Sequence, residues 1–239
     1  MQLCVALDLP SEKQNLALVA QFCGFSGLWL KIGLSSFVRG GRGFVESVRA
    51  AHPSARLFLD LKLYDIPNTM LETTKAIAEI GIDMFTIHAS SGTEAMRAVA
   101  EQLGALPKPP LVFAVSVLTS FDERGFAEIY GTGSLCERAQ HMAHLASMCG
   151  IDGMVCSVHE SRAIKAQTGL LTLTPGIRPF ATLANDQKRV GSLQDALNAQ
   201  SDFVVMGRPI YEAQNPQKAL TDCYAWLQSQ TKGTDNGYA

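Results

Sequence analysis

Charged side chains stand at the end of an apolar, strand-like run in Phe58-Leu59-Asp60-Leu61-Lys62-Leu63-Tyr64-Asp65-Ile66-Pro67-Asn68-Thr69. Side chains alternate between the two faces of a strand, so Asp60 and Lys62 are expected on one face and the intervening leucines on the other. Burying charges costs free energy unless they pair with each other or with a ligand. A single Asp-x-Lys pair suits a structural ion pair, but Asp65 and the helix-starting Pro67 nearby favour a functional site.

Similar apolar runs recur along the whole chain and alternate with helical patterns. The expected strands are Leu3–Leu7, Gly27–Ile32, Leu57–Leu61, Met84–His88, Leu111–Val117, Gly153–Cys156, Leu171–Thr174 and Phe203–Met206. The expected helices are Ser11–Cys23, Phe37–Ala51, Thr69–Ile80, Gly92–Leu103, Leu135–Cys149, Val158–Thr168, Ser192–Ala199 and Pro216–Gln228.

This alternation predicts an α/β protein, because each strand leads into a helix and the strands must then run parallel. Eight such units favour a closed (β/α)8 TIM barrel, which leaves no edge strand. An open doubly wound sheet is the alternative, but the turn after the first strand lacks a G-x-G-x-x-G phosphate loop. We expect one catalytic domain over residues 1–230 and a flexible polar C-terminal tail over residues 231–239.

Composition fits a globular protein that works on a small ligand. Of 239 residues, 47% are hydrophobic, and 20 Lys and Arg against 22 Asp and Glu give a net charge of −2, so no broad nucleic-acid surface is expected. The six cysteines are scattered without a C-x-x-C pair, which is typical of reduced thiols. No signal peptide or membrane-spanning run is recognisable, and we expect a cytoplasmic protein that binds no membrane.

Two further strand ends carry charges like those of residues 58–69. Lys31 lies near the end of its apolar strand, and Asp8 directly follows the first strand. The carboxyl ends of barrel strands meet at one mouth, where catalytic groups of this fold gather. Asp8 alone would also suit a turn or a helix cap. Together with Asp60 and Lys62, these residues predict alternating acids and lysines around the mouth.

Two glycine- and arginine-containing segments predict a phosphate site. Arg178 follows the seventh expected strand, and Gly207 and Arg208 follow the eighth, where phosphate sites of (β/α) barrels often form. Residues 176–190 lack a clear periodicity, and a loop of this length suggests a lid, with Gln187 reaching the ligand.

Two residues at other strand ends are less specific. Thr119, after the fifth strand, suits a hydrogen bond to a ligand amide or a capping hydroxyl equally well. His88 ends the fourth strand without a neighbouring nucleophile, which favours a structural role.

In order along nearly the whole chain, these pieces resemble the orotidine 5′-phosphate decarboxylase family. The matching segments are Ala6–Asp8, Leu30–Gly33, Asp60–Thr69, His88–Gly92, Val117–Ser120, Thr174–Pro179, Asp186–Gln187 and Gly207–Pro209. The resemblance implies decarboxylation of orotidine 5′-phosphate to UMP and CO₂, the last step of de novo pyrimidine nucleotide synthesis. It implies no cofactor and no metal.

The same resemblance implies a role for each site residue. The catalytic array would be Lys31, Asp60, Lys62 and Asp65, with Lys62 as the proton donor. A homodimer would be required, because Asp65 and Thr69 would come from the neighbouring subunit. The substrate would be bound through its ribose by Asp8 and Lys31, its pyrimidine by Thr119, its base and phosphate by Gln187, and its phosphate by Arg178, Gly207 and Arg208.

Physical chemistry supports Lys62 as the central group. Loss of CO₂ leaves negative charge on a ring carbon, and a fixed ammonium in a water-poor site can stabilise it and then donate a proton. Asp60 beside the substrate carboxylate would be a like-charge contact that is relieved as CO₂ leaves, a secondary effect. Asp60 and Asp65 would keep Lys62 charged, and Lys31 would balance the acids.

Three other functions stay open at this point. A magnesium-dependent sugar-phosphate decarboxylase or lyase shares the D-x-K-x-x-D strand, although residues 66–69 and the Gln187 lid favour the nucleotide enzyme. A Schiff-base aldolase would use Lys62 as a nucleophile, but flanking carboxylates stabilise its protonated form. A non-catalytic nucleotide-phosphate binding protein would not need an intact array of lysines and aspartates.

Overall fold

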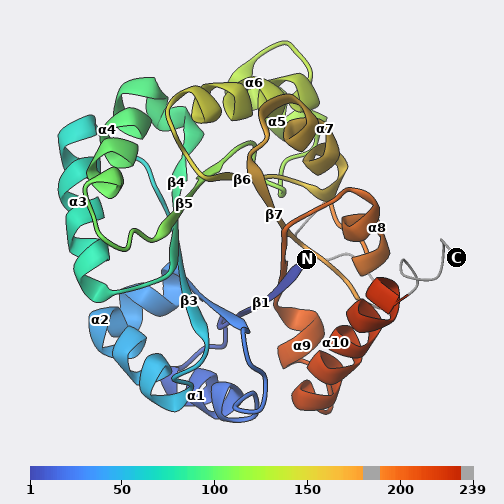
Figure 1. The fold of residues 1–239 in the computed structure, drawn as a ribbon. Coiled ribbons are helices and arrows are strands. Elements are labelled where there is room, and N and C mark those ends of the chain that lie inside the picture. The colour runs from blue at the N-terminus through green and yellow to red at the C-terminus, as the bar shows by residue number, and fades with distance from the viewer. Residues whose placement is uncertain (180–188, 233–239) are drawn as a thin grey trace, which may run out of the picture.

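The computed structural model describes residues 1–179 and 189–232, and its strands form a closed parallel barrel in the order β1 to β8 (Figure 1). The strands are β1 Gln2–Ala6, β2 Trp29–Gly33, β3 Arg56–Leu63, β4 Met84–His88, β5 Leu111–Val115, β6 Gly153–Val155, β7 Leu171–Pro175 and β8 Phe203–Met206. The predicted (β/α)8 barrel is therefore confirmed.

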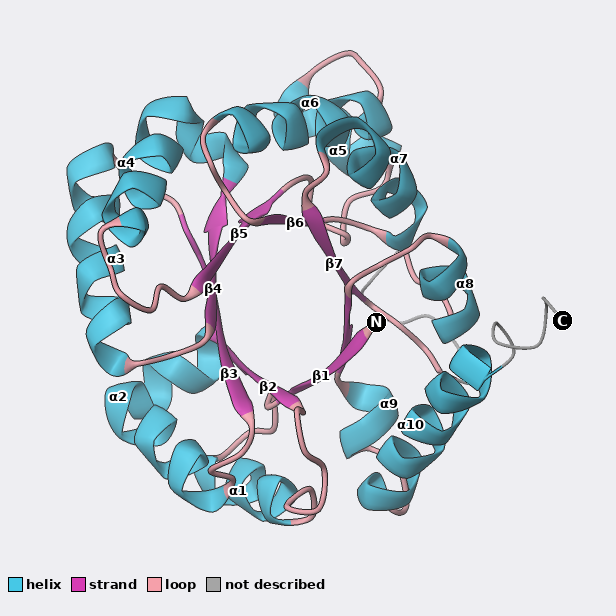
Figure 2. Ribbon diagram, in the orientation of Figure 1, coloured by secondary structure: helices cyan, strands magenta, loops and turns pink. Residues whose placement is uncertain are grey.

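Helices surround the strand ring on its outside (Figure 2). They are α1 Glu12–Ala20, α2 Leu34–Ala51, α3 Pro67–Ile80, η1 Ala89–Ser91, α4 Gly92–Gly104, α5 Glu123–Tyr130, α6 Leu135–Met148, α7 Val158–Thr168, α8 Leu193–Asn198, α9 Arg208–Tyr211 and α10 Pro216–Lys232. No helix within the described part of the chain combines the length and the apolar character needed to cross a membrane.

Two α-helices were not expected from the sequence. The first, α5, follows β5 and is capped by Asp122, whose side chain accepts a hydrogen bond from the backbone N–H of Gly125. It has only eight residues, and the interior glycine weakens its helical pattern. The second, α9, is a four-residue turn of helix that starts at Arg208. The expected phosphate loop after β8 is therefore a helix N-terminus.

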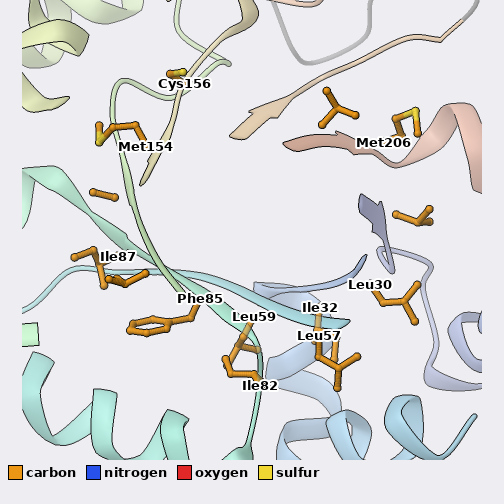
Figure 3. Packing of buried hydrophobic residues seen from close by; sticks show 14 of the residues in the cluster. Leu30, Ile32, Leu57, Leu59, Ile82, Phe85, Ile87, Met154, Cys156 and Met206 are labelled. Carbon is orange, nitrogen blue, oxygen red and sulfur yellow. The ribbon is translucent and has the colours of Figure 1, made fainter. Parts of the chain in front are cut away.

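The barrel wall divides the apolar side chains into two clusters. On the outer face, residues such as Leu30, Leu57 and Leu59 pack against the helices (Figure 3). On the inner face, the rings of Trp29 and Phe113 each pack edge-on against Phe203, with centroids 5.4 and 5.6 Å apart. Aromatic rings thus fill the barrel interior, as is usual for this fold.

A repeated hydrogen bond ties neighbouring strands together where they begin. Asp83 before β4, Asp152 before β6 and Asp202 before β8 each accept a backbone N–H from the start of the preceding strand, at 2.8 to 2.9 Å. The donors are Leu57, Val112 and Thr172. These contacts satisfy polar groups at the end of the barrel opposite the mouth.

Candidate active site

A cavity of about 440 Å³ opens at the carboxyl ends of the barrel strands. Its volume is in the usual range for small-molecule sites. The site residues expected from the sequence that line it are Asp8, Lys31, Asp60, Lys62, Thr119, Arg178, Gly207 and Arg208. The structure therefore brings together side chains from both halves of the chain around one space.

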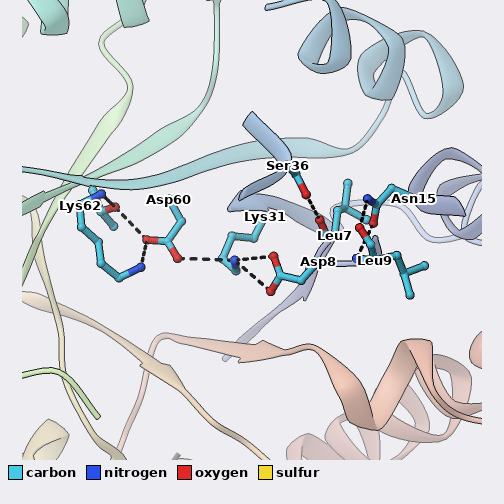
Figure 4. Close-up of polar contacts among 9 residues, drawn as sticks. Leu7, Asp8, Leu9, Asn15, Lys31, Ser36, Asp60 and Lys62 are labelled. Carbon is cyan, nitrogen blue, oxygen red and sulfur yellow. Dashed lines mark hydrogen bonds and ion pairs between the residues drawn. The ribbon is translucent and has the colours of Figure 1, made fainter. Parts of the chain in front are cut away.

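Four charged side chains form a row of alternating sign along this cavity (Figure 4). Lys31 Nζ lies 3.3 Å from Asp8 Oδ1 and 3.5 Å from Asp60 Oδ2, and Lys62 Nζ lies 2.9 Å from Asp60 Oδ1. The Lys31 side chain is 10% exposed and that of Asp60 14%, whereas Lys62 is 39% exposed. Asp8, at the other end of the row, is 38% exposed, so both ends of the row are open and a ligand can reach the Lys62 ammonium.

Each inner charge of the row is stabilised by its neighbours. Burial alone would lower the pKa of Lys31, but the carboxylates of Asp60 and Asp8 outweigh it and raise that pKa above its ordinary value. Burial alone would raise the pKa of Asp60, but Lys31, Lys62 and a hydrogen bond from Thr86 hold that pKa below its ordinary value. Both groups are therefore ionised at neutral pH.

Backbone irregularity at the end of β3 presents Lys62 to the cavity. The pairing register between β3 and β4 shifts between Leu59 and Leu63, and Lys62 has a φ of 53°. Left-handed backbone is uncommon for a residue other than glycine, asparagine or aspartate, and such strain gathers at functional sites. The alternation rule predicts the side of the strand that Lys62 occupies, but not this conformation.

Thr86 supports the row and was not expected from the sequence. This fully buried threonine on β4 donates its hydroxyl to Asp60 Oδ1 and accepts a hydrogen bond from the Lys62 backbone N–H, both at 2.9 Å. A threonine in an apolar strand is an ordinary strand-former, so nothing in its own stretch of sequence marks it. Only its position beside β3 in the closed barrel reveals its role.

The cavity is also lined by the two arginines expected to bind phosphate, one after β7 and the other after β8. Arg178 is 8% exposed, and its Nη2 has no hydrogen-bond partner among the described residues. An unsatisfied buried guanidinium nitrogen is costly, so an anionic ligand would satisfy it. Gly207 precedes Arg208 at the start of α9, and a Cβ at Gly207 would approach the Tyr211 ring to 3.3 Å.

Tyr211 lines the cavity and is a second residue that sequence reasoning missed. Burial raises the pKa of its hydroxyl, and the charge of Asp8 adds to this effect. It lies on α9, which was itself not expected, so no pattern pointed to it.

Two expected site residues that the structure describes do not line this cavity. Asp65 and Thr69 are exposed, and Asp65 Oδ1 accepts a hydrogen bond from the adjacent backbone N–H of Ile66. Gln187 lies outside the described residues. The array within one chain is therefore Asp8, Lys31, Asp60 and Lys62.

His88 has structural contacts of the kind expected. Its Nδ1 accepts a hydrogen bond from the Ser90 backbone N–H at 3.2 Å, and its ring stacks on Tyr64 with centroids 5.7 Å apart. Burial lowers its pKa, and the charge of Lys62 lowers it further.

The described residues contain no group of three or more His, Cys, Asp or Glu side chains placed to hold a metal ion.

Comparisons with known proteins agree with this geometry. The family model described as "Orotidine 5'-phosphate decarboxylase / HUMPS family" matches residues 1–223. The orotidine 5′-phosphate decarboxylase of Wolinella succinogenes is 53% identical over 92% of this chain and 96% of its own.

Two crystal structures extend the comparison to three dimensions. The orotidine 5′-phosphate decarboxylase of Lactobacillus acidophilus is 28% identical with a TM-score of 0.79, covering 94% of this chain and 97% of its own. An uncharacterized conserved protein from Geobacillus kaustophilus is 32% identical with a TM-score of 0.80, covering 93% and 98%.

A closed (β/α)8 barrel whose mouth carries a row of alternating acids and lysines together with two arginines defines an enzyme for a small phosphorylated substrate. The sequence match specifies the family to which this enzyme belongs. This chain belongs to the orotidine 5′-phosphate decarboxylase / HUMPS family, as its motifs predicted, and is similar over nearly its whole length to decarboxylases of that name.

Proposed function

We propose that this chain converts orotidine 5′-phosphate to UMP and CO₂, the last step of de novo pyrimidine nucleotide synthesis, with Lys62 as the group that stabilises the intermediate and protonates it. The observation that carries the proposal is the Lys62 ammonium, held 2.9 Å from Asp60 at an open end of the charged row. The family and the names of its members support the reaction.

The reaction breaks the bond between the pyrimidine ring and its carboxylate. CO₂ departs, the electron pair stays on the ring carbon, and the Lys62 ammonium stabilises that pair before donating a proton to it. Solvent then returns a proton to Lys62. A fixed positive charge needs no reorganisation during this step.

Asp60 and Lys31 prepare Lys62 rather than reacting themselves. Asp60 accepts hydrogen bonds from Lys62 and Thr86, which fix the direction of its carboxylate. Asp60 would also face the substrate carboxylate, a repulsion that disappears when neutral CO₂ leaves. Lys31 forms ion pairs with both Asp8 and Asp60, and together with Lys62 it holds the pKa of Asp60 below its ordinary value.

The other expected site residues would hold the nucleotide. Arg178, Arg208 and the backbone at Gly207 would bind the phosphate, and Asp8 and Lys31 the ribose hydroxyls. Thr119 would face the pyrimidine, and Gln187 would bridge base and phosphate. Binding energy from the phosphate, which is remote from the reacting carbon, can then be used to lower the barrier.

We also propose a homodimer in which each subunit donates Asp65 and Thr69 to its partner's site. Within one chain Asp65 is exposed and does not line the cavity, although it lies only three residues after Lys62. Its neighbours Tyr64 and Ile66 are each 66% exposed, which is unusual for large apolar side chains and typical of a surface that another molecule covers.

Subunit complementation tests both the dimer and the role of Asp65. Lys62→Ala and Asp65→Ala dimers should each be nearly inactive. After subunit exchange, random pairing gives about one quarter of the sites a full set of side chains, so about that fraction of activity should return. A mixture that exchanges subunits but stays inactive would show that Asp65 does not act across the interface.

Loss of the substrate's ultraviolet absorbance gives the direct assay of the reaction. Turnover that persists in a strong chelator would separate this function from a magnesium-dependent lyase, and absence of turnover would favour a binding protein.

A cytoplasmic location completes the proposal. It is supported by the cysteines, all six of which are free thiols, as expected in a reducing compartment.

A further inference from the structure

Arg189 holds three consecutive backbone carbonyls of the loop that carries Thr119. Its Nη2 donates to Val117 O at 2.9 Å and to Leu118 O at 3.3 Å, and its own backbone N–H donates to Thr119 O at 3.3 Å. Arg189 does not line the cavity, and its side chain is 14% exposed. A single residue outside the site therefore sets the path of the chain on both sides of Thr119.

The other side of the Arg189 guanidinium is fixed by α7. Nη1 forms an ion pair with Glu160, whose side chain is 3% exposed, and also donates to Ser157 Oγ at 3.3 Å. Glu160 in turn accepts the Ser157 backbone N–H at 2.9 Å as part of the capping box of α7. The guanidinium is thus held by a rigid helix end, so it can hold the Thr119 loop in place.

The segment that begins at Arg189 also contacts the phosphate side of the cavity. Two residues later, Gly191 O accepts a hydrogen bond from the Arg178 backbone N–H at 2.8 Å, and Gly191 pairs with Ile177 in a parallel bridge. Residues 189–191 therefore contact the segments of both Thr119 and Arg178.

We propose that Arg189 is a positioning residue that sets Thr119 against the pyrimidine of the bound nucleotide. The inference rests on the proposed role of Thr119. Arginine suits this task because its planar fork offers donors in several directions at once, to carbonyls on one side and a carboxylate on the other. Lysine can keep the charge opposite Glu160, but cannot reproduce the fork.

Ligand selectivity of Arg189→Lys tests the proposal. UMP carries the base, whereas ribose 5-phosphate carries only the sugar and phosphate. Misplacing Thr119 should weaken UMP binding by about ten-fold, the effect of one well-placed hydrogen bond, and change ribose 5-phosphate binding by less than about two-fold. Equal weakening of both ligands, or no change for either, overturns the proposal.

Lys165→Met is the matched control. Lys165 lies on the same helix as Glu160 and forms a partly buried ion pair with Asp202 near the start of β8. Its loss should lower thermal stability without changing the relative affinity for the two ligands. If Arg189→Lys does not fold, Glu160→Gln provides the same comparison, because it removes the charge that anchors the guanidinium.

A double-mutant comparison assigns the effect to Thr119. The effects of Arg189→Lys and Thr119→Ala on kcat/KM should not add. The double variant should have a kcat/KM within about two-fold of that of the less active single variant. Asp8 lies on the opposite side of the cavity, so the fold-reductions in kcat/KM caused by Arg189→Lys and Asp8→Asn should multiply in the double variant. Multiplication in both pairs refutes the positioning role. If Thr119→Ala alone leaves UMP binding unchanged, the role of Thr119 is wrong, and with it this inference, while decarboxylation by Lys62 is unaffected.

Discussion

Lys62 Nζ lies 2.9 Å from Asp60 Oδ1, and Lys62 reaches this position with its backbone in the left-handed region, at a φ of 53°. The ion pair and the hydrogen bond from the Lys62 N–H to Thr86 compensate for the strained backbone. Strain of this kind costs on the order of 1 to 3 kcal/mol. The fold therefore bears a conformational cost to direct one ammonium into the cavity.

Removing that ammonium should abolish turnover and spare binding. Lys62→Ala should lower kcat by at least about 10³-fold, because the developing carbanion loses its counter-charge, while UMP still binds through its phosphate and ribose. Steady-state kinetics and calorimetry with UMP measure the two effects. Lys75→Ala, at an exposed lysine on α3, is the control. Near-normal turnover in Lys62→Ala would exclude the proposed role.

Gly33 keeps space open for the charged row. A Cβ at this position would lie 2.7 Å from Asp8 Oδ1 and 3.0 Å from Lys31 Nζ, so Gly33→Ala should displace the Asp8 carboxylate. The backbone of Gly33 is extended, and we expect the variant to fold with kcat/KM reduced by about ten-fold. Gly43→Ala, where a Cβ meets nothing within 4 Å, should keep full activity. Equal activity in both variants would contradict this explanation.

Arg178 should act on the phosphate alone. Arg178→Ala should weaken UMP binding by about ten- to hundred-fold, because a charged hydrogen bond in a buried site is lost. Uridine, which has no phosphate, should bind the variant and the parent equally well. Titration of both ligands checks the prediction, and a matching loss for uridine would mean that Arg178 supports the site in another way.

His88 should make stability depend on pH on the acidic side of neutrality. Its pKa is lowered in the folded protein from an ordinary 6.5, so below about that pH the unfolded chain binds the proton more readily. The free energy of unfolding should therefore fall as pH drops from 6.5, and His88→Gln should flatten this part of the curve. Urea unfolding at a series of pH values measures it. An unchanged slope in the variant would rule out His88 as the cause.

Much of the barrel could be predicted from the sequence. Buried parallel strands are short apolar runs, and the predicted bounds of β4 and β8 agree with the structure to the residue. Helix α5 was not predicted because it is short and contains Gly125. Helix α9 was not predicted because one helical turn has no periodicity to detect. Periodicity reveals long elements, whereas tertiary contacts determine short ones.

Some residues of the candidate site could likewise be predicted from the sequence, and others could not. Charges in apolar strands identified Lys31, Asp60 and Lys62, since a buried charge needs a reason. Thr86 and Arg189 were missed because their partners lie far away in the chain: Arg189 contacts Val117, 72 residues distant. Such residues carry no local signal, and only the closed barrel brings them to their partners.

Asp83, Asp152 and Asp202 secure the starts of the strands at the rim opposite the cavity. The chain thereby separates the groups that keep the barrel closed from those that perform the chemistry. Loops at the mouth could accordingly be exchanged for those of another decarboxylase without loosening the scaffold. In a grafting experiment the strands and these three aspartates should be kept. New substrate preferences can be sought by changing the loops at the mouth.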